Sequence, residues 1–512
     1  MNTLFSILCI VAISAGCIAS LVKFIHFFQL NSYRASLQLR WIRLNVSKII
    51  PNFIIGIIAL SGAIIGGFGG KIIFLATAVL GCLTSISKKA KKPLVYTMRV
   101  KRLIATNAVL YIIAIALGIA FGRVLVFSAL FFLLMPLVII AANFVNMPME
   151  KAITNYYIND AKKMLSGSNA RVIGITGSYG KTSVKYYLTT LLKAKYNVLM
   201  TPESYNTPMG VVKTIRSSLN AFHEIFVCEM GAKRVGEIKE ICDIVSPEMG
   251  VITSVGPQHL QTFKSLDNVK KTKFELADAL PEGGALFLNC SDKNINDHKG
   301  TRQHIGYSIN GNAPYNVEEI TVSEKGSNFK LCFPSGEKHE FSTKLIGEHN
   351  VLNIAGAIAV AHTLGIEPQA LKLQVAKLQS VPHRLELVAR GNDIIIDDAY
   401  NSNPSGTKAA LSTLSCFEGF KILLTPGMVE LGEKQAELNC AFGEDAAKVC
   451  DYVILVGKNS EPIAEGLAKA SYPEEKTYRA QTFTEAIEHA YSINSYGQKK
   501  IILLENDLPD NY

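Results

Sequence analysis

Hydrophobic and polar positions divide this chain into two parts near residue 150. Apolar residues are concentrated before that point, in five stretches: residues 4–22, 53–68, 72–86, 103–121 and 124–145. The first, fourth and fifth stretches are long enough to cross about 30 Å of hydrocarbon as helices. The second and third are shorter and rich in glycine, which predicts either a close-packed helical hairpin around Gly69 and Gly70 or a re-entrant or interfacial pair.

Basic residues are concentrated in two of the segments that connect these stretches. One segment carries Lys23, Arg34, Arg40, Arg43 and Lys48, and the other carries Lys88, Lys89, Lys91, Lys92, Arg99, Lys101 and Arg102. The other two connections hold only Lys71 and Arg123. By the positive-inside rule both basic segments are cytoplasmic. Five spans then predict a multi-pass protein of the cell membrane, with everything after about Asn146, including any catalytic domains, in the cytoplasm.

The net charge of +10 is explained by the same basic segments. Their position next to apolar stretches favours anionic membrane lipid as the partner. We expect no nucleic acid partner, because zinc-finger spacing and RNA-binding signatures are absent. The ten cysteines include no C-x-x-C pair and are expected to be reduced core residues.

After residue 171 short apolar runs alternate with helical patterns. Strands are predicted at residues 172–175, 225–230, 249–253 and 285–289, with helices at 183–195, 207–218, 234–242 and 266–279 between them. This alternation indicates a mostly parallel sheet covered by helices on both faces. Polar residues 291–344 predict short antiparallel strands, and residues 349–364 predict a closing helix.

A second α/β unit begins near residue 385. Its predicted strands are residues 393–397, 421–425, 452–456 and 500–504, with helices that include 405–414 and 437–449. With a boundary near Pro382, the predicted domains are a transmembrane region at 1–150, a central domain at 151–382 and a C-terminal domain at 383–512.

A phosphate-binding loop is predicted between the first strand and the first helix of the central domain. Residues 174–182 read GITGSYGKT and fit G-x-x-x-x-G-K-[ST]. Glycines let several backbone N–H groups face one phosphate, and the helix N-terminus adds positive potential. A chance glycine-rich turn is the alternative. The predicted nucleotide-binding residues are Gly177, Ser178, Gly180, Lys181, Thr182 and Ser183. Lys181 would hold the β- and γ-phosphates of ATP, and the hydroxyl of Thr182 would bind Mg²⁺.

Seven further segments follow this loop in an order that resembles the Mur ligase family. They read SYNTPMGV, VCEMGAKRVGEI, ITSVGPQHLQTFKSLDNVKKTKFELADALPEGG, GEHNVLNIAGAIAVAHTLG, HRLELV, IIIDDAYNSNPSGTKAAL and GMVELGEKQAELN. Members of this family are ATP-dependent amide ligases that add amino acids to peptidoglycan precursors. The resemblance covers about residues 172–504. It implies a P-loop central ATPase domain and a Rossmann-like C-terminal ligase domain.

The resemblance also implies a metal site. Glu229 is similar to the family's magnesium carboxylate, and His259 to the histidine that binds a second magnesium. Lys273 aligns with a lysine that the family carbamylates, which turns a cation into an anionic oxygen donor. Each residue has a structural alternative: a solvated charge at a strand end for Glu229, a satisfied structural residue for His259, and a surface lysine of a charged helix for Lys273.

Four more residues are implied to contact the nucleotide. Arg384 would reach from the C-terminal domain to the γ-phosphate, so that Lys181, Lys273 and Arg384 form the expected catalytic set. Asp398 and Asn401 follow a predicted strand and would contact the nucleotide, Asn401 at the adenine or ribose. Asn350 is a further nucleotide candidate, with a helix N-cap as the alternative. A family histidine is replaced here by Asn439.

The implied reaction has two steps. A carboxylate attacks the γ-phosphate of ATP to give an acyl phosphate, and an amine then displaces phosphate to form an amide. Within the family the best resemblance implies addition of D-alanyl-D-alanine to a muramoyl peptide. Predicted membrane spans stand where the family has a domain that binds the UDP-sugar, so the cell-wall acceptor is expected to be UDP- or lipid-linked, and the amine an amino acid or dipeptide.

Three alternatives remain open from the sequence. The chain could be a ligase for a different lipid-linked envelope acceptor, or a non-catalytic membrane scaffold that recruits envelope enzymes. A membrane transport ATPase is the third, but it would require an L-S-G-G-Q-like signature and an apolar run that ends in Asp-Glu. Neither pattern is found.

Overall fold

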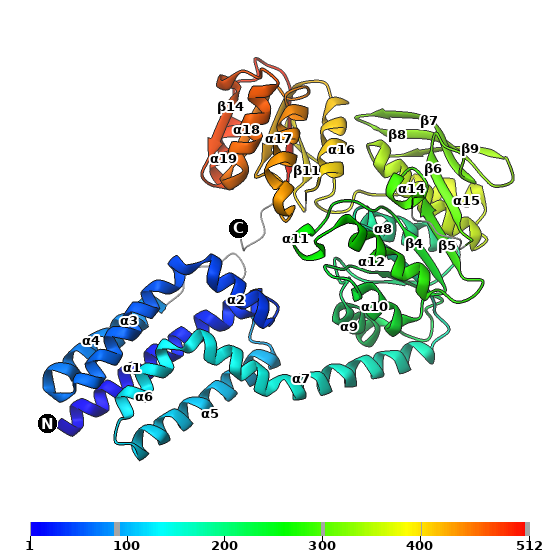
Figure 1. Ribbon diagram of the computed structural model, residues 1–512. Helices are drawn as coiled ribbons and strands as arrows, with labels where there is room; N and C mark the ends of the chain where they lie inside the picture. The colour runs from blue at the N-terminus through cyan, green and yellow to red at the C-terminus, as the bar shows by residue number, and fades with distance from the viewer. Residues whose placement is uncertain (1, 86–92, 298–302, 401, 507–512) are drawn as a thin grey trace. The chain divides into compact units, whose positions relative to one another are not determined.

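The computed structural model describes residues 2–85, 93–297, 303–400 and 402–506 (Figure 1). Lys88, Lys89, Lys91 and Lys92 of the second basic segment, and the predicted nucleotide contact Asn401, lie outside the described residues. The chain divides into two compact units, one formed by residues Met1–Tyr156 and the other by Tyr157–Leu508.

The first unit is entirely helical over its described residues. Its helices are α1 (Asn2–Leu30), α2 (Ala35–Leu44), α3 (Val46–Ile65), α4 (Gly67–Ser85), α5 (Met98–Ala120), α6 (Val124–Leu133) and the first part of α7 (Met135–Ser166). Four of them, α1, α3, α4 and α5, are long and apolar enough to cross a membrane. The count becomes five if α6 and α7 are taken together as one bent span.

The predicted glycine-rich hairpin is present in α3 and α4. The chain turns at Gly66 and Gly67, with φ of +64° and +60°, rather than at Gly69 and Gly70. The helices then touch through glycine, because a Cβ built on Gly62 would stand 2.8 Å from the Gly70 carbonyl oxygen. Small residues allow this backbone approach.

The prediction of one continuous helix over residues 124–145 is wrong. The chain breaks at Leu134 into α6 and α7, which are bent by 83°. Pro136 is the cause, since it has no N–H to bond the Phe132 carbonyl and so cannot continue a helix from α6. Proline at the start of a helix is tolerated, and α7 begins one residue before it.

The central part of the second unit is a nine-stranded sheet. Its strands are β1 (Arg171–Thr176), β2 (Val198–Met200), β3 (Ile225–Glu229), β4 (Met249–Ile252), β5 (Ala285–Asn289), β6 (Ile305–Ile309), β7 (Tyr315–Ser323), β8 (Gly326–Cys332) and β9 (Lys338–Thr343). They lie in the order β2-β3-β1-β4-β5-β6-β7-β8-β9. Strands β1 to β7 pair in parallel, and β7, β8 and β9 pair antiparallel.

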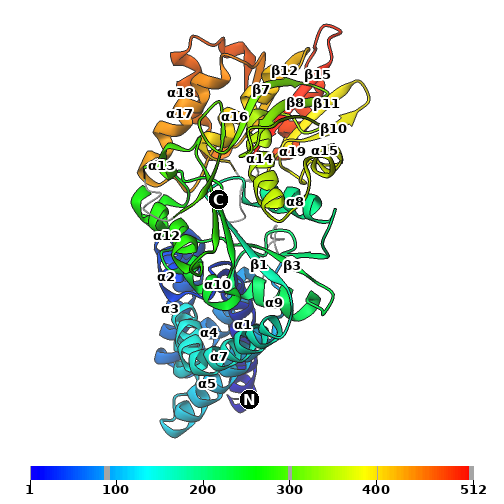
Figure 2. The same cartoon turned by 90° about the vertical axis from the view of Figure 1, so that its right-hand side faces the viewer.

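Helices cover both faces of this sheet (Figure 2). On one face α8 (Lys181–Leu192), α14 (Glu348–Thr363) and α15 (Pro368–Val375) enclose a core with β1 and β3. On the other face α9 (Pro208–Ser218), α10 (Glu237–Val245) and α12 (Leu266–Ala279) enclose a second core. The short helices α11 (Leu260–Phe263) and α13 (Lys293–Asn296) follow β4 and β5.

The C-terminal part of the second unit is a six-stranded sheet. Its strands are β10 (Glu386–Arg390), β11 (Asp393–Asp398), β12 (Phe420–Thr425), β13 (Tyr452–Val456), β14 (Thr477–Ala480) and β15 (Lys500–Glu505), in the order β10-β11-β15-β12-β13-β14. All pairs are parallel except β10 with β11. One face packs on α16 (Pro404–Ser415), α17 (Gln435–Ala446) and α18 (Ser460–Lys469), and the other on α19 (Phe483–Ser492). The predicted fold class, apolar helices followed by two α/β domains, is confirmed.

Candidate active site

The phosphate-binding loop lies between β1 and α8, as predicted. Gly177 and Gly180 have φ of +154° and +79°, which side chains rarely adopt. A Cβ on Gly177 would stand 2.0 Å from Thr253 Oγ1, and one on Gly180 would stand 2.6 Å from Asn353 Oδ1. Gly177 therefore requires glycine for space as well as for conformation, and Gly180 requires it for conformation.

The loop is fixed to the segment that follows β4. Ser178 Oγ donates to the Gly256 carbonyl at 3.1 Å and accepts from the Gly256 N–H at 3.0 Å. Tyr179 donates its hydroxyl to the Pro257 carbonyl at 2.9 Å and its N–H to Ser254 Oγ at 2.7 Å. The side chain of Ser178 thus shapes the loop and is already satisfied by protein groups.

Lys181 is the first residue of α8, and its side chain folds back onto the loop that precedes the helix. Its Nζ donates to the carbonyls of Gly177 at 2.7 Å and Ser178 at 3.2 Å. Burial lowers the pKa of Lys181 to about 8; Arg384 acts in the same direction and the carboxylate of Glu229 opposes both. The structure therefore brings these three charged groups of the prediction close enough to interact.

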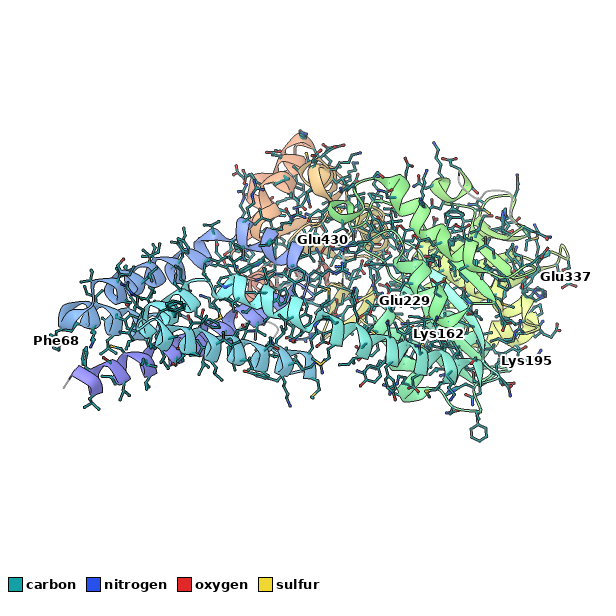
Figure 3. The ribbon with its side chains drawn as sticks, turned by 60° about the horizontal axis from the view of Figure 1, so that its bottom comes forward. Phe68, Lys162, Lys195, Glu229, Glu337 and Glu430 are labelled. Carbon is teal, nitrogen blue, oxygen red and sulfur yellow. The ribbon has the colours of Figure 1, made fainter. Side chains whose placement is uncertain are left out.

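Glu229 ends β3 beside the loop and is only 1% exposed (Figure 3). Its Oε1 accepts from Thr182 Oγ1 at 3.2 Å and from Asn206 Nδ2 at 2.9 Å. Its Oε2 lies 3.0 Å from Lys185 Nζ but has no hydrogen bond of adequate geometry. Burial alone would raise the pKa of Glu229, but Lys185 and Lys181 hold it below its ordinary value.

This donor set fits a magnesium ion. A hydroxyl and an ionised carboxylate are the hard oxygen ligands that Mg²⁺ prefers, and here the hydroxyl of Thr182 lies 3.2 Å from the carboxylate of Glu229. The alternative interpretation of Glu229, a solvated charge at a strand end, does not hold, because the side chain is buried.

Lys273 lies on α12 and is buried, with 1% exposure. Burial, followed by the nearby charge of Lys181, lowers its pKa well below the ordinary value. The alternative of a surface lysine is therefore excluded. Only an unprotonated amine reacts with carbon dioxide, and a lowered pKa favours that form, so the environment of Lys273 suits the predicted carbamate.

His259 follows β4 and caps α11, with a left-handed φ of +50°. Its Nδ1 contacts Glu430 Oε2, from the loop after β12. Burial lowers the pKa of His259 although Glu430 opposes it, and the charges of Lys233 and Lys181 add to the lowering. His259 is thus within electrostatic range of Lys181, but its hydrogen-bonding partner is a residue that the sequence did not point to.

Arg384 and Asp398 lie at the start of the C-terminal sheet. The Arg384 guanidinium stacks over the Tyr400 ring, 4.1 Å from its centroid. Asp398 ends β11, and its Oδ1 accepts from the Leu385 N–H at 3.3 Å. Burial raises the pKa of Asp398 to about 6, and Arg384 opposes this.

Another predicted nucleotide contact, Asn350, is engaged by groups inside the central domain. Asn350 donates to the Ile346 carbonyl at 2.9 Å and accepts from the Tyr187 hydroxyl at 2.8 Å. Both ends of its amide are thus used, and the N-cap of α14 is Gly347 rather than Asn350. Asn353, one turn later, is the asparagine next to Gly180. Ser183 is buried in the first turn of α8.

Sequence reasoning missed four polar residues that the structure places at or near the site: Lys185, Asn206, Glu430 and Glu505. Lys185 follows the quoted GITGSYGKT segment, four residues after Lys181, and a helix puts such residues on one face. That spacing was the available signal. Asn206 and Glu430 stand in the quoted segments SYNTPMGV and GMVELGEKQAELN, but nothing there pointed to their partners, and Glu505 lies outside every quoted segment.

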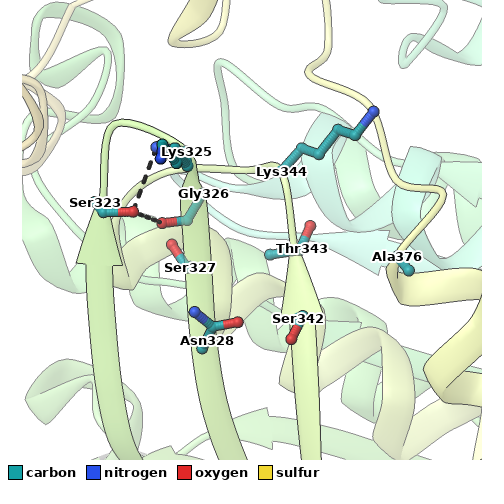
Figure 4. Close-up of a pocket in the computed structure, with 9 residues that line it drawn as sticks. All are labelled: Ser323, Lys325, Gly326, Ser327, Asn328, Ser342, Thr343, Lys344 and Ala376. Atoms are coloured by element: carbon teal, nitrogen blue, oxygen red, sulfur yellow. Dashed lines mark hydrogen bonds between the residues drawn. The ribbon is translucent and has the colours of Figure 1, made fainter.

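A cavity of about 270 Å³ lies elsewhere, at the β7–β8 turn and the end of β9 (Figure 4). Its polar lining includes Ser323, Lys325 and Lys344. Ser323 Oγ donates to the Gly326 carbonyl and accepts from the Lys325 N–H, so these groups stabilise the turn itself. None of the predicted site residues lines this cavity.

Comparison with known proteins identifies the family of this chain. Residues 175–361 match the Mur ligase middle domain, and residues 383–504 match the Mur ligase, glutamate ligase domain. The chain is 32% identical over 314 residues to UDP-N-acetylmuramoyl-tripeptide--D-alanyl-D-alanine ligase of Escherichia coli, covering 60% of this chain and 69% of the relative. The Bacillus subtilis enzyme of the same name is also 32% identical, with 60% and 67% covered.

Solved structures give the same result. MurF from Acinetobacter baumannii superposes with a TM-score of 0.63 at 25% identity, covering 69% of this chain and 77% of that one. MurF ligase from Thermotoga maritima, crystallised with ADP, superposes with a TM-score of 0.61 at 25% identity, covering 69% and 80%. The chain belongs to the Mur ligase family and is an ATP-dependent ligase that joins an acid to an amino acid.

Proposed function

We propose that this ligase joins D-alanyl-D-alanine to the peptide carboxylate of a muramoyl peptide, with ATP and Mg²⁺. The relatives named above carry out this addition according to their names. The observation that carries the proposal is the buried Glu229, which lies between the hydroxyl of Thr182 and the two lysines of the phosphate loop and its helix. A scaffold would have no need to keep a buried carboxylate ionised next to a phosphate loop.

The residues act by positioning and by charge. Lys181 would exchange the loop carbonyls for the β- and γ-phosphate oxygens of ATP. Arg384, already within range of Lys181, would neutralise charge on the γ-phosphoryl group as the acceptor carboxylate attacks it. Thr182, Glu229, His259 and a carbamylated Lys273 would hold Mg²⁺, which supplies further neutralisation of the phosphate charge. The amine then attacks the acyl phosphate, phosphate leaves, and the amide forms.

The apolar unit supports a place in the cell membrane. Four helices long and apolar enough to span, in a chain whose ligase domains begin after residue 150, favour an anchored enzyme with cytoplasmic catalytic domains, in the order 1–150, 151–382 and 383–512. They also favour a lipid-linked muramoyl peptide over the UDP-linked form as acceptor. Retention in the membrane fraction after alkaline carbonate extraction tests the anchoring, and release into the supernatant would contradict it.

The activity is tested with the full chain in detergent, by measuring phosphate released from Mg-ATP. One arm contains UDP-muramoyl-tripeptide, a second its undecaprenyl-linked form, each with D-alanyl-D-alanine. We expect turnover in the lipid arm, lowered about 100- to 1,000-fold in a Lys181→Met variant because one phosphate-binding cation is lost. Turnover in the UDP arm alone would contradict the lipid-linked acceptor, and no turnover in either arm would contradict the proposed substrate.

A further inference from the structure

Glu430 lies on a loop that burial and hydrogen bonds attach to the C-terminal domain. Its neighbours Met428 and Leu431 are buried, whereas its own side chain is 31% exposed. Asn439, fully buried on α17, accepts from the Met428 N–H at 2.8 Å and donates to the Met428 carbonyl at 3.0 Å. The residue that stands in place of the family's histidine therefore fixes the backbone two positions before Glu430.

The partner of Glu430 is His259, on a loop of the central domain that is also held by hydrogen bonds. Asp292 accepts from the Val255 N–H at 2.8 Å, and Asn294 donates to the Val255 carbonyl at 2.7 Å. Glu430 and His259 both have left-handed backbones, with φ of +63° and +50°. Such conformations cost about 1–3 kcal/mol each and persist where the surroundings impose them, which is common at functional sites.

The contact decides which nitrogen of His259 is available. With Nδ1 engaged by a carboxylate, the proton of the neutral ring resides on Nδ1, and Nε2 keeps the lone pair that a metal requires. Carboxylates that hold a metal-binding histidine in this way also raise its basicity. Lys233, whose Nζ lies 3.9 Å from Glu430 Oε1, places a cation near the other oxygen of that carboxylate.

We propose that Glu430 is a positioning residue, which fixes the tautomer and orientation of His259 for the second metal ion and does so from the other domain. This inference rests on the proposed function. Its consequence is that the metal site of the central domain is completed only when the loop after β12 meets the loop after β4. Assembly of the metal site is thereby coupled to the arrangement of the two domains.

The test is metal affinity rather than turnover. Mn²⁺ binding to the full chain in detergent, with ADP present, is followed by electron paramagnetic resonance. We expect Glu430→Ala to raise the dissociation constant of the more weakly bound Mn²⁺ ion, taken as the second metal ion of the site, by about 10- to 100-fold. Glu430→Gln, which keeps an acceptor but loses the charge, should fall between this variant and the wild type. Glu433→Ala is the matched control, because Glu433 is an exposed glutamate three residues along the same loop.

A second set of variants separates positioning from general structure. In a His259→Ala background, the further change Glu430→Ala should have no effect on Mn²⁺ affinity, because Glu430 acts through His259. In the metal-free wild type, the ¹⁵N spectrum of His259 should show the Nδ1–H tautomer, assigned by its loss in His259→Ala. This signal should shift in Glu430→Ala but not in Glu433→Ala.

Three results would overturn the inference. Unchanged Mn²⁺ affinity in Glu430→Ala would mean that the contact only joins the domains. Tighter binding would mean that Glu430 withholds His259 from the metal. Additive losses in the double variant would mean that Glu430 acts independently of His259. A wild-type chain that binds no Mn²⁺ would instead overturn the proposed function, and this inference with it.

Discussion

The two sheets of the ligase region each end a strand with a buried carboxyl group, and the two environments act on these groups in opposite ways. Glu229, at the end of β3, is held ionised by Lys185 and Lys181. Asp398 and Glu505, register neighbours at the ends of β11 and β15, have pKa values that burial raises. The difference is that the carboxylate of Glu229 has a cation, Lys185, in direct contact. The ionised carboxylate suits a metal, whereas the raised pKa values of Asp398 and Glu505 favour a proton shared between the two carboxyl groups.

Lys185→Met should break this contrast most strongly. Both members of the Lys185–Glu229 pair are buried, so loss of the lysine leaves a carboxylate without its counter-ion. We expect a loss of about 3–5 kcal/mol in the free energy of unfolding, measured by urea denaturation of the full chain. The double variant Lys185→Met, Glu229→Leu should recover much of that loss. A double variant as unstable as the single one would show that packing, not charge, is responsible.

Asp398→Asn should remove a pH dependence that the C-terminal domain owes to this half-buried carboxyl group at the end of β11. The folded pKa of about 6 lies above the ordinary 3.8. The wild type therefore loses stability as the pH rises from about 4 through about 6. The variant should be more stable than the wild type at pH 7 by about 1–3 kcal/mol, and equal to it near pH 4. Thermal unfolding without nucleotide at both pH values tests this, and a constant difference would contradict it.

Ser402→Ala should have a smaller effect on the same pair. Ser402 is buried and donates to Glu505 Oε1 at 2.7 Å. Its loss should cost about 1 kcal/mol of stability, the usual contribution of one hydrogen bond. If the hydroxyl acts through the carboxyl group, the cost should be absent in a Glu505→Met background, which has no oxygen to accept it. The same urea measurement in both backgrounds decides the point.

Tyr400→Leu should have the smallest effect. The Tyr400 ring is half exposed, and an exposed cation–π contact with Arg384 contributes about 0.5–1 kcal/mol. We expect kcat/KM for ATP to fall about two- to fivefold, with Tyr400→Phe close to the wild type because the ring is kept. A large loss in Tyr400→Phe would point instead to a role for the hydroxyl.

Patterns of local sequence predicted the long elements well and the marginal ones poorly. The strand β5 and the helix α12 have the predicted bounds, because each is a complete apolar or amphipathic run. The strands β2 and β14 were missed, since three or four residues give no periodicity and their pairing supplies the stability. In the apolar region, composition alone did not reveal that Pro136 divides the last stretch.

The residues of the candidate site also fall into two groups: those that local motifs predicted and those that only the fold brings together. Motifs pointed to Lys181, Thr182, Glu229, Lys273 and Arg384, because their chemistry is written in contiguous segments. The pairings of Glu229 with Lys185 and of His259 with Glu430 join residues 44 and 171 positions apart, and only the fold brings them together.

The close fit of Gly177 against Thr253 has a consequence for how this sequence can vary. A single methyl group at residue 177 would overlap a hydroxyl 76 positions away. Thr253 cannot withdraw freely, because its Oγ1 donates to the carbonyls of Thr176 and Tyr179. The constraint therefore runs in one direction: residue 253 can become smaller while Gly177 is kept, whereas a side chain at residue 177 must meet both this overlap and the left-handed backbone. Thr253→Ala should accordingly be tolerated far better than Gly177→Ala, and Thr253→Ala should restore only part of what Gly177→Ala loses.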